Sequence, residues 1–211
     1  MGRSGARRGV SRRHARWAPS RHEILRLLVV AFVVLAARSS LADHYVIPTG
    51  SMEHTIEIGD HVLVDKLAYG ARLPFTGWRL TRGEAPARGE VVIFDSPVDG
   101  TRLIKRVVGV GGDLVRLRNG ELLIDGRSQR APNRGGIERI NGHEAHLNLV
   151  HGGGADVPSL RVPGGLLLVV GDARGNSLDG RSFGLIPGEI VYGKATGIIY
   201  RRSEGLVWRG L

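Results

Sequence analysis

The stretch DLVRLRNGELLIDG, residues 113–126, is the clearest structural signal in the sequence. Apolar and polar residues alternate on both sides of Asn119 and Gly120, the pair favoured in the two-residue turn of a β-hairpin. No helical period of comparable strength appears from Asp43 onward. Other short runs of strand type lie at residues 45–47, 61–66, 90–94, 102–110, 165–171, 189–200 and 206–208. The sequence therefore predicts a mainly β fold.

Length and composition agree with this fold class. The 211 residues suffice for one membrane segment and one globular domain. Glycine, at 32 residues, is about twice as frequent as its ~7% average, and the apolar residues lean toward Val, Ile and Leu, which suits a turn-rich β structure. Residues 127–160 are rich in Gly, Asn, Arg and His with little apolar period, which predicts an irregular insertion or a small satellite lobe outside the core.

The basic character of the chain is concentrated at its N-terminal end. The formal net charge is +10, but residues 1–22 hold seven arginines and no acidic residue, so the rest carries only +3. An arginine-rich leader before an apolar run is typical of a cytoplasmic tail, whereas a nucleic-acid-binding protein needs a basic stripe on its folded domain. We therefore expect no nucleic-acid partner. The absence of cysteine excludes disulfides and thiolate metal sites.

The apolar segment at residues 24–42 permits two interpretations. Its 19 residues would form a helix of about 28 Å, close to the ~30 Å hydrocarbon core of a bilayer, which predicts one membrane span with the N-terminus inside. The alternative is a cleaved signal peptide, because the uninterrupted apolar core covers only residues 27–37 and the Ser-Leu-Ala sequence at 40–42 offers small residues at cleavage spacing. Both interpretations place residues 43–211 on the side of the membrane opposite to the cytoplasm.

A candidate nucleophile is Ser51 in the stretch YVIPTGSMEHTIEIG, residues 45–59. It follows a strand-like run and stands behind Pro48, which stiffens the approach, and Gly50, which lets another backbone come close. Such a position suits an exposed hydroxyl beside a backbone N–H donor. The Pro-Thr-Gly-Ser sequence is also an ordinary turn, and the segment alone favours that interpretation.

A candidate base is Lys105 in RLIKRVVGVGGD, residues 102–113. In a strand, alternation puts it on one face with Leu103 and Val107, so it lies between two aliphatic neighbours. At the free pKa of ~10.4 only about one lysine in 2,500 is neutral at pH 7, but burial lowers that pKa by up to ~3–5 units and makes the neutral amine available. A lysine at a strand edge whose ammonium reaches water is the alternative, which this segment alone favours.

Five motifs share one order with a known family. The motifs are GSMEHT at residues 50–55, GDHVLVDKLAYG at 59–70, RGEVVIFDSP at 88–97, LIKRVVGVGGD at 103–113 and GDARGNSLDGRSFGLIP at 171–187. Over residues 43–126 and 165–200 the chain resembles the bacterial type I signal peptidases, the Ser/Lys leader peptidases of family S26. The resemblance implies a membrane-bound serine endopeptidase that removes N-terminal signal peptides from exported preproteins and cleaves after small-x-small sites.

The resemblance also implies an architecture and a location. A cytoplasmic tail at residues 1–22 would lead into a transmembrane helix at 23–42, followed by a coiled antiparallel β-sheet catalytic domain at 43–211 with the insertion at 127–160. The protein would be a single-pass protein of the bacterial inner membrane, with its N-terminus cytoplasmic and its catalytic domain on the outer, periplasmic side. Its partners would be exported preproteins and the lipid bilayer, and it would use no metal or cofactor.

The site roles are carried over residue by residue. Ser51 would attack the scissile carbonyl, and Lys105 would take the hydroxyl proton and pass it to the leaving amine. The Ser51 N–H and the Thr49 hydroxyl would form the oxyanion hole. Five residues of the last motif would support the site: Ser177, which would orient the lysine amine, Asp179 and Arg181, which would form an ion pair, and Asp172 and Arg174. The residues expected to line the substrate pockets, with ordinary core as the alternative for each, are Tyr45, Ile47, Met52, Ile56, Val62, Leu103 and Ile104.

Several features set limits on this interpretation. The sequence departs from the family pattern at His54, Ala173, Gly175 and Gly180, which puts substrate range in doubt more than activity. Residues 143–146, His-Glu-Ala-His, fall one residue short of zinc-protease spacing, so we expect no metal there. A soluble cytoplasmic Ser/Lys peptidase of the repressor type is one rival, against which the apolar segment argues. An inactive membrane-anchored peptide-binding protein is the other, against which the presence of both Ser51 and Lys105 argues.

Overall fold

A computed structural model describes residues 20–40, 42–71, 80–81 and 83–211. Contacts divide the chain into two units, Met1–Leu35 and Ala36–Leu211, the second of which is called the β unit below. The arginine-rich tail expected at residues 1–22 lies outside the described residues except for its last three.

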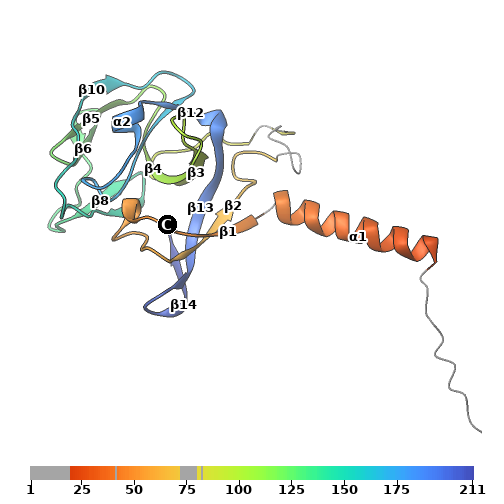
Figure 1. Cartoon of the computed structure of the whole chain (residues 1–211). Helices are drawn as coiled ribbons and strands as arrows, with labels where there is room; N and C mark the ends of the chain where they lie inside the picture. Colours follow the sequence, from red (N-terminus) through yellow and green to blue (C-terminus); the bar gives the residue numbers. More distant parts are fainter. Residues whose placement is uncertain (1–19, 41, 72–79, 82) are drawn as a thin grey trace, which may run out of the picture. The chain divides into compact units, whose positions relative to one another are not determined.

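Helix α1, Arg21–Ser40, is the first element of the chain (Figure 1). It starts with a capping box, in which Glu23 N–H donates to Ser20 Oγ at 3.2 Å and Ser20 N–H donates to the Glu23 carboxylate at 2.7 Å. Within residues 21–30 of α1, six large apolar side chains are exposed: Ile24, Leu25, Leu27, Leu28, Val29 and Val30. Within the described part of the chain, no helix is at once long and apolar enough to cross a membrane. The single span expected from the sequence is therefore not shown.

Antiparallel strands are the main regular structure of the β unit, and the mainly β class is confirmed. The main sheet has the strand order β1-β2-β13-β3-β4-β11-β12, with β14 paired to β13 (Figure 1). The bounds of these strands are β1 Ala42–Val46, β2 His61–Asp65, β3 Val91–Asp95, β4 Arg102–Val110, β11 Leu166–Val170, β12 Ile186–Pro187, β13 Val191–Arg201 and β14 Gly205–Gly210. Short helical turns connect them: η1 Gly50–Met52, α2 Gly180–Phe183 and η2 Gly188–Ile190.

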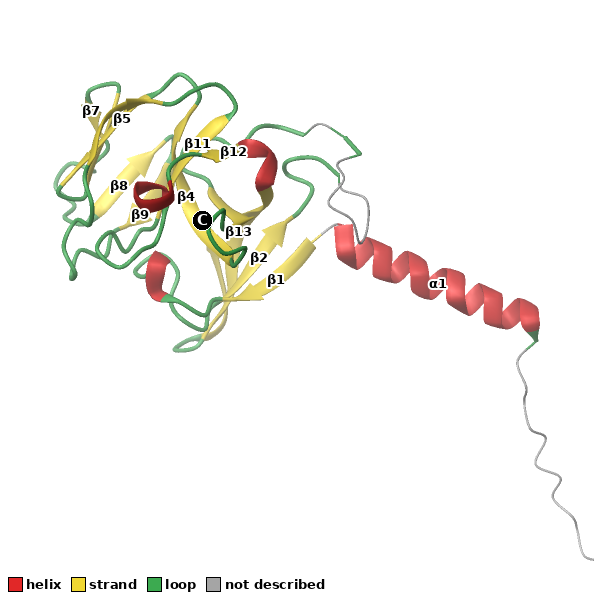
Figure 2. Cartoon of the chain, turned by 45° about the horizontal axis from the view of Figure 1, so that its top comes forward, coloured by secondary structure: helices red, strands yellow, loops and turns green. Residues whose placement is uncertain are grey.

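The hairpin expected at residues 113–126 is confirmed. Arg118 lies opposite Glu121, and the two turn residues, Asn119 and Gly120, have φ angles of +49° and +76°, as this kind of two-residue turn requires. The hairpin belongs to a second sheet with the order β10-β5-β6-β7, whose bounds are β5 Leu114–Arg118, β6 Glu121–Ile124, β7 Arg127–Ser128 and β10 Val157–Arg161. Figure 2 shows β5 and β7 at the end of the β unit opposite to β1 and β2.

The segment 127–160 contributes to the core. Besides β7 and β10, it forms a small two-stranded sheet of β8, Ile137–Ile140, and β9, His143–His146. Ile140 and Val157 belong to the same buried cluster as Leu168 of the main sheet. This corrects the expectation of a segment outside the core: its apolar residues are few, but its short strands turn them inward.

Strand β4 is packed on both of its faces. It lies between β3 and β11 in the main sheet. Ile104 belongs to one buried cluster and Val107 to another. The two charged residues between them, Lys105 and Arg106, are only 2% and 0% exposed. Because a charge buried in this way must be neutralised or paired, β4 is where the chemistry of the site begins.

Candidate active site

Ser51 is held in a rigid turn beside the sheet. It is the middle residue of η1, which follows β1 and the stiff Pro48. Met52, the last residue of η1, is fully buried in the core and anchors the turn. The Ser51 carbonyl accepts a hydrogen bond from Ala173 N–H at 3.1 Å, which fixes the turn to the chain after β11. The side chain is thus presented from a fixed backbone, and the residue is 8% exposed.

Lys105 reaches Ser51 from the middle of strand β4. Its Nζ lies 2.7 Å from Ser51 Oγ and donates to the carbonyl of Ile104 at 2.9 Å. The alternative of an edge lysine with its ammonium in water does not hold, because β4 is an interior strand and the side chain is buried. The structure therefore brings the two sequence-predicted residues into hydrogen-bond contact.

The surroundings of Lys105 favour its neutral form. Burial lowers the pKa of Lys105 to about 8, and the nearby charge of Arg181 acts in the same direction. The charges of Asp179 and Asp172 oppose this effect without cancelling it. At a pKa of about 8, about one molecule in ten carries a neutral amine at pH 7. The amine is thereby available as a base near neutral pH.

The carboxylates whose charges act on Lys105 are already paired. Asp172 forms an ion pair with Arg106 at 2.8 Å, and Asp179 forms one with Arg181 at 2.8 Å. Burial opposes ionisation of Asp179, but the hydrogen bonds and charge of Arg181 outweigh it and lower the pKa of that carboxyl. Protonation of Lys105 would therefore add an uncompensated positive charge to a buried and balanced group of charges.

Two ion-pair partners of the predicted site residues, Arg106 and Glu138, were not predicted from the sequence. Asp172 and Arg174 were expected to support the site; Asp172 pairs with Arg106, and Arg174 pairs with Glu138 of β8. A signal for Arg106 was present, because an arginine in an apolar interior strand needs a carboxylate. Glu138 gave no such signal, since it lies in the polar segment that was assigned to the outside. The predicted ion pair of Asp179 with Arg181 is present.

Ser177 lies near the site without the predicted contact. Its buried Oγ makes no hydrogen bond to the Lys105 amine, and its interaction with the Asp179 carboxylate helps to lower the pKa of that carboxyl. A Cβ added at Gly171 would lie 2.2 Å from Ser177 Oγ and 2.4 Å from the Ser51 carbonyl oxygen. The hydroxyl therefore faces the backbone of the nucleophile.

Thr49, the predicted second oxyanion donor, is exposed and has extended backbone angles. Its side chain makes no capping hydrogen bond to η1, although a threonine before a helix is well suited to such a cap. The hydroxyl is therefore not committed to the turn that carries Ser51.

The predicted pocket residues divide into two groups. One buried cluster contains Ile47, Met52, Ile56, Val62 and Ile104, with Tyr45 packed against it. Leu103 packs against a different cluster, because adjacent residues of a strand point to opposite faces. Met52, Ile56 and Val62 have no exposed surface, so they are part of the core in this structure.

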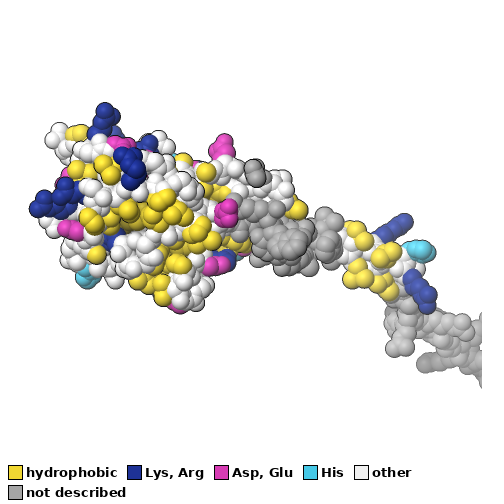
Figure 3. Space-filling model, turned by 90° about the horizontal axis from the view of Figure 1, so that it is seen from above, with side chains coloured by type: hydrophobic (Ala, Val, Ile, Leu, Met, Phe, Trp, Pro, Cys, Tyr) yellow, Lys and Arg dark blue, Asp and Glu magenta, His cyan; other side chains and the backbone are white. Residues whose placement is uncertain are grey.

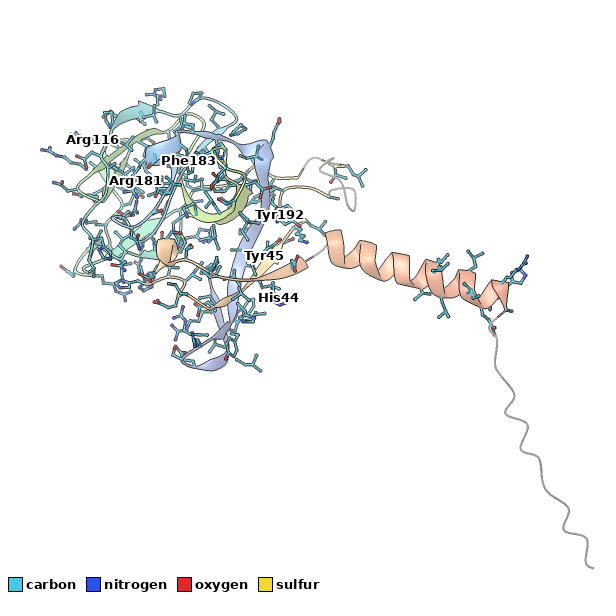
Figure 4. The ribbon with its side chains drawn as sticks, in the orientation of Figure 1. His44, Tyr45, Arg116, Arg181, Phe183 and Tyr192 are labelled. Carbon is cyan, nitrogen blue, oxygen red and sulfur yellow. The ribbon has the colours of Figure 1, made fainter. Side chains whose placement is uncertain are left out.

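Tyr45 is engaged by charged and aromatic neighbours. Its hydroxyl accepts a hydrogen bond from Arg102 at 3.0 Å, and the Arg102 guanidinium lies 4.3 Å from the centre of the Tyr192 ring. Figure 4 shows Tyr45 and Tyr192 at the same end of the β unit, away from Arg181 and Phe183. The tyrosine is thus fixed at the end of the sheet where β1 forms the edge.

A cleft beside the nucleophile turn does not include the Ser51–Lys105 pair. It has a volume of about 430 Å³, and its lining includes His54, Thr55, His143 and His146. In the part of the chain that the structure describes, no three His, Asp or Glu side chains are arranged to hold a metal ion.

Comparisons with known proteins agree on one family. Residues 20–200 match the family described as "Signal peptidase, peptidase S26". Signal peptidase I of Pseudomonas fluorescens is 34% identical over 191 residues, which cover 79% of this chain and 67% of that protein, and signal peptidase I of Pseudomonas aeruginosa gives the same values. A crystal structure of a signal peptidase I from Enterococcus faecalis V583 is 29% identical with a TM-score of 0.38, covering 54% of this chain and 98% of that chain.

Proposed function

Because this chain belongs to the signal peptidase family, peptidase S26, and is a serine endopeptidase, we propose that it removes signal peptides from exported preproteins with a Ser51/Lys105 dyad. The observation that carries the dyad is the buried Lys105 amine, 2.7 Å from Ser51 Oγ and with its pKa lowered to about 8. A nucleophile within hydrogen-bond reach of a base whose pKa lies near the working pH is the arrangement that acyl transfer requires.

The reaction proceeds in two halves. Ser51 Oγ attacks the scissile carbonyl carbon while the neutral Lys105 amine takes the hydroxyl proton. The ammonium then gives that proton to the leaving amine, and the C–N bond breaks to leave an acyl-enzyme. In the second half, Lys105 takes a proton from the water that attacks the ester carbonyl; the C–O bond to Ser51 then breaks, the ammonium returns the proton to Ser51 Oγ, and the signal peptide is released. Burial favours the neutral amine at the start of each half.

Thr49 and Ser177 complete the site. The Ser51 N–H and the Thr49 hydroxyl stabilise the oxyanion, and the absence of a capping bond from Thr49 supports this role. Ser177 Oγ binds the lysine amine when the substrate is in place. Its position supports that role, because the Ser177 hydroxyl and the Ser51 carbonyl oxygen both lie against Gly171. The pair of Asp179 and Arg181 and the side chains of Asp172 and Arg174 hold the surrounding backbone.

The substrate binds in extended form by adding a strand, and small side chains one and three positions before the cut enter shallow pockets. Support comes from the topology, because β1 is the edge strand of the main sheet and leads directly to the nucleophile turn. Tyr45, Ile47, Leu103 and Ile104 are the pocket residues with some exposed surface. Met52, Ile56 and Val62 contribute from behind.

The chain acts at the bacterial inner membrane, with residues 23–42 as its anchor, the N-terminus in the cytoplasm and the β unit on the periplasmic side. Exposed apolar side chains on both units support contact with a bilayer or an apolar peptide. They include the α1 residues named above and, on the β unit, Val46, Ile58, Leu206 and Trp208. Figure 3 shows a broad area of apolar side chains on one face of the β unit.

The test is cleavage of a purified preprotein by the detergent-solubilised full-length chain, with the new N-terminus sequenced. We expect a cut after a small-x-small site, and we expect Ser51→Ala and Lys105→Met to lower kcat by about 10²- to 10⁴-fold. Lys66→Met, which removes another buried lysine, is the matched control and should keep its activity. If the wild type and all three variants are equally inert on several preproteins yet still bind a signal peptide, the protein is a peptide-binding protein and the proposal fails.

A further inference from the structure

Residues 53–55, which follow the turn that carries Ser51, make hydrogen bonds to residues 146–148 of the segment 127–160. Thr55 Oγ1 accepts a hydrogen bond from His146 N–H at 3.0 Å. The His54 ring nitrogen Nδ1 lies 3.0 Å from the Leu147 carbonyl oxygen. The Asn148 side-chain amide donates to a Glu53 carboxylate oxygen at 3.1 Å. The two stretches, 53–55 and 146–148, therefore run past one another in opposite directions, and each residue of one contacts a residue of the other.

Asn148 is the fixed end of this pairing. The residue is 7% exposed, and its Oδ1 accepts a hydrogen bond from Val150 N–H at 3.0 Å. Its backbone N–H donates to the Asp172 carbonyl at 3.1 Å, and its carbonyl accepts from Arg174 N–H at 3.1 Å. Both its side chain and its backbone are thus committed, so the amide that points at Glu53 has little freedom to move.

Glu53 is the other end of the pairing, and it lies against the nucleophile turn. Its N–H caps η1 by donating to the Gly50 carbonyl at 3.1 Å. Its carboxylate folds back over Gly50, so closely that a Cβ there would lie 2.3 Å from Oε1. A carboxylate fixed over Gly50 restrains the residue next to Ser51, whose own carbonyl is held from the other side by Ala173.

We infer that Asn148 is a positioning residue, which holds the Ser51 turn in register with Lys105 by fixing the Glu53 carboxylate over Gly50. This inference rests on the proposed function for its kinetic consequence. Asn148 touches neither the dyad nor a reacting atom, so its loss acts on the approach of Ser51 Oγ to the base and the scissile carbonyl. A misplacement of 1 Å in such a geometry costs up to about 10²-fold in rate.

The first test is Asn148→Ala in the full-length protein, with preprotein cleavage as the assay. We expect kcat to fall about tenfold while KM stays within about twofold, because the substrate pockets are untouched. The matched control is Gln129→Ala, which removes another side-chain amide of the same segment, one that donates to the Arg127 carbonyl at 2.9 Å. The control should retain the kcat of the wild type.

A charge exchange separates positioning from simple loss of stability. Asn148→Asp sets a second carboxylate against Glu53 and should lower kcat more than Asn148→Ala does. Adding Glu53→Gln to it supplies an amide donor from the opposite side, restores the hydrogen bond and should recover most of the lost kcat. A double variant no more active than Asn148→Asp alone would overturn the inference.

A second measurement does not depend on the proposed function. Hydrogen exchange of the peptide spanning residues 50–56 should become faster in Asn148→Ala than in the wild type and stay unchanged in Gln129→Ala. If the wild type cleaves no preprotein, the proposed function fails, but faster exchange in Asn148→Ala would still show that the hydrogen bond from Asn148 to Glu53 holds the Ser51 turn. If exchange in this peptide is unchanged, or if it rises while kcat does not fall in an active enzyme, the inference is overturned.

Discussion

Two lysines of the β unit are buried, and their pKa values move in opposite directions. Lys66 is 7% exposed and pairs with Asp43 at 3.0 Å, whereas no carboxylate of the described residues is within ion-pair distance of Lys105. Burial lowers the pKa of Lys66, but hydrogen bonds with Tyr192 and Asp43 outweigh it and raise that pKa. For Lys105 burial prevails, and the pKa falls to about 8. Burial by itself therefore does not decide the pKa of a lysine. The pKa falls at Lys105 because the nearby carboxylates are paired with arginines, whereas Asp43 pairs directly with Lys66.

The largest effect expected from this comparison is on stability. The unfolded chain keeps the Lys105 proton up to a pH near 10.5, but the folded chain releases it above about 8, so in this window the free energy of unfolding rises with pH. Below pH 8 the full penalty of the buried amine remains. Lys105→Met should therefore raise the free energy of unfolding by up to about 3 kcal/mol at pH 7.

Chemical denaturation of the full-length wild type and Lys105→Met at several pH values measures this gain. The gain should shrink from pH 8 upward and disappear near pH 10.5, where the lysine of the folded and of the unfolded chain are both neutral. Equal stability of the two proteins at pH 7 would show that the amine carries no such penalty.

The next effect concerns the charge that keeps Lys105 neutral. Arg181→Gln removes a positive charge near the amine and leaves the Asp179 carboxylate without its ion-pair partner. Both changes raise the pKa of Lys105, so the acid limb of the pH–rate profile should move to higher pH. A shift of about one unit would lower activity at pH 7 about tenfold.

The measurement is kcat/KM against pH, accompanied by a melting curve that shows the variant is folded. Arg209→Gln, which breaks the exposed pair with Glu204, is the control and should leave the profile unchanged. An unshifted acid limb in a folded Arg181→Gln protein would mean that this charge does not set the pKa of the base.

The smallest effect is at Lys66 and has the opposite sign to that at Lys105. Because the pKa of Lys66 is raised, its contribution to stability is present below about 10.5 and is lost as the pH rises through the raised value. Lys66→Met should lower the free energy of unfolding at pH 7, by at most about 1 kcal/mol for a partly exposed pair. Denaturation at pH 7 would contradict the comparison if this variant were stabilised as Lys105→Met is.

Local pattern sufficed for the elements that lie along the chain. The hairpin at residues 113–126 and strand β4 were predicted because alternation and a turn pair are written in adjacent residues. The proximity of Ser51 and Lys105 came from the motifs that resemble a family. The pairing of residues that are distant in the sequence could not be predicted from local pattern. Arg106 pairs with Asp172, 66 residues away, and Arg174 pairs with Glu138, 36 residues away.

The same limit explains the remaining differences. Leu103 was grouped with Ile104, although neighbours in a strand face opposite sides and belong to different buried clusters. The segment 127–160 was placed outside the core because its composition is polar, yet Glu138 and Asn148 are buried there through bonds to residues of the site. Buried polar residues with distant partners look like surface residues until the partners are known.

Lys105 and Arg106 are neighbours on one strand and point to opposite faces of it, so the proposed Ser51/Lys105 dyad depends on the register of β4. A chain that paired this strand one residue out of register would turn the guanidinium toward Ser51 and the amine toward Asp172. Such a sheet would still form a hydrogen-bond ladder, but a group that never gives up its proton would stand beside the nucleophile. For the proposed dyad, a translation of one residue would thus separate an enzyme from an inert protein of the same fold, and the pairing of β4 with β11 already shifts in register between Leu168 and Val169.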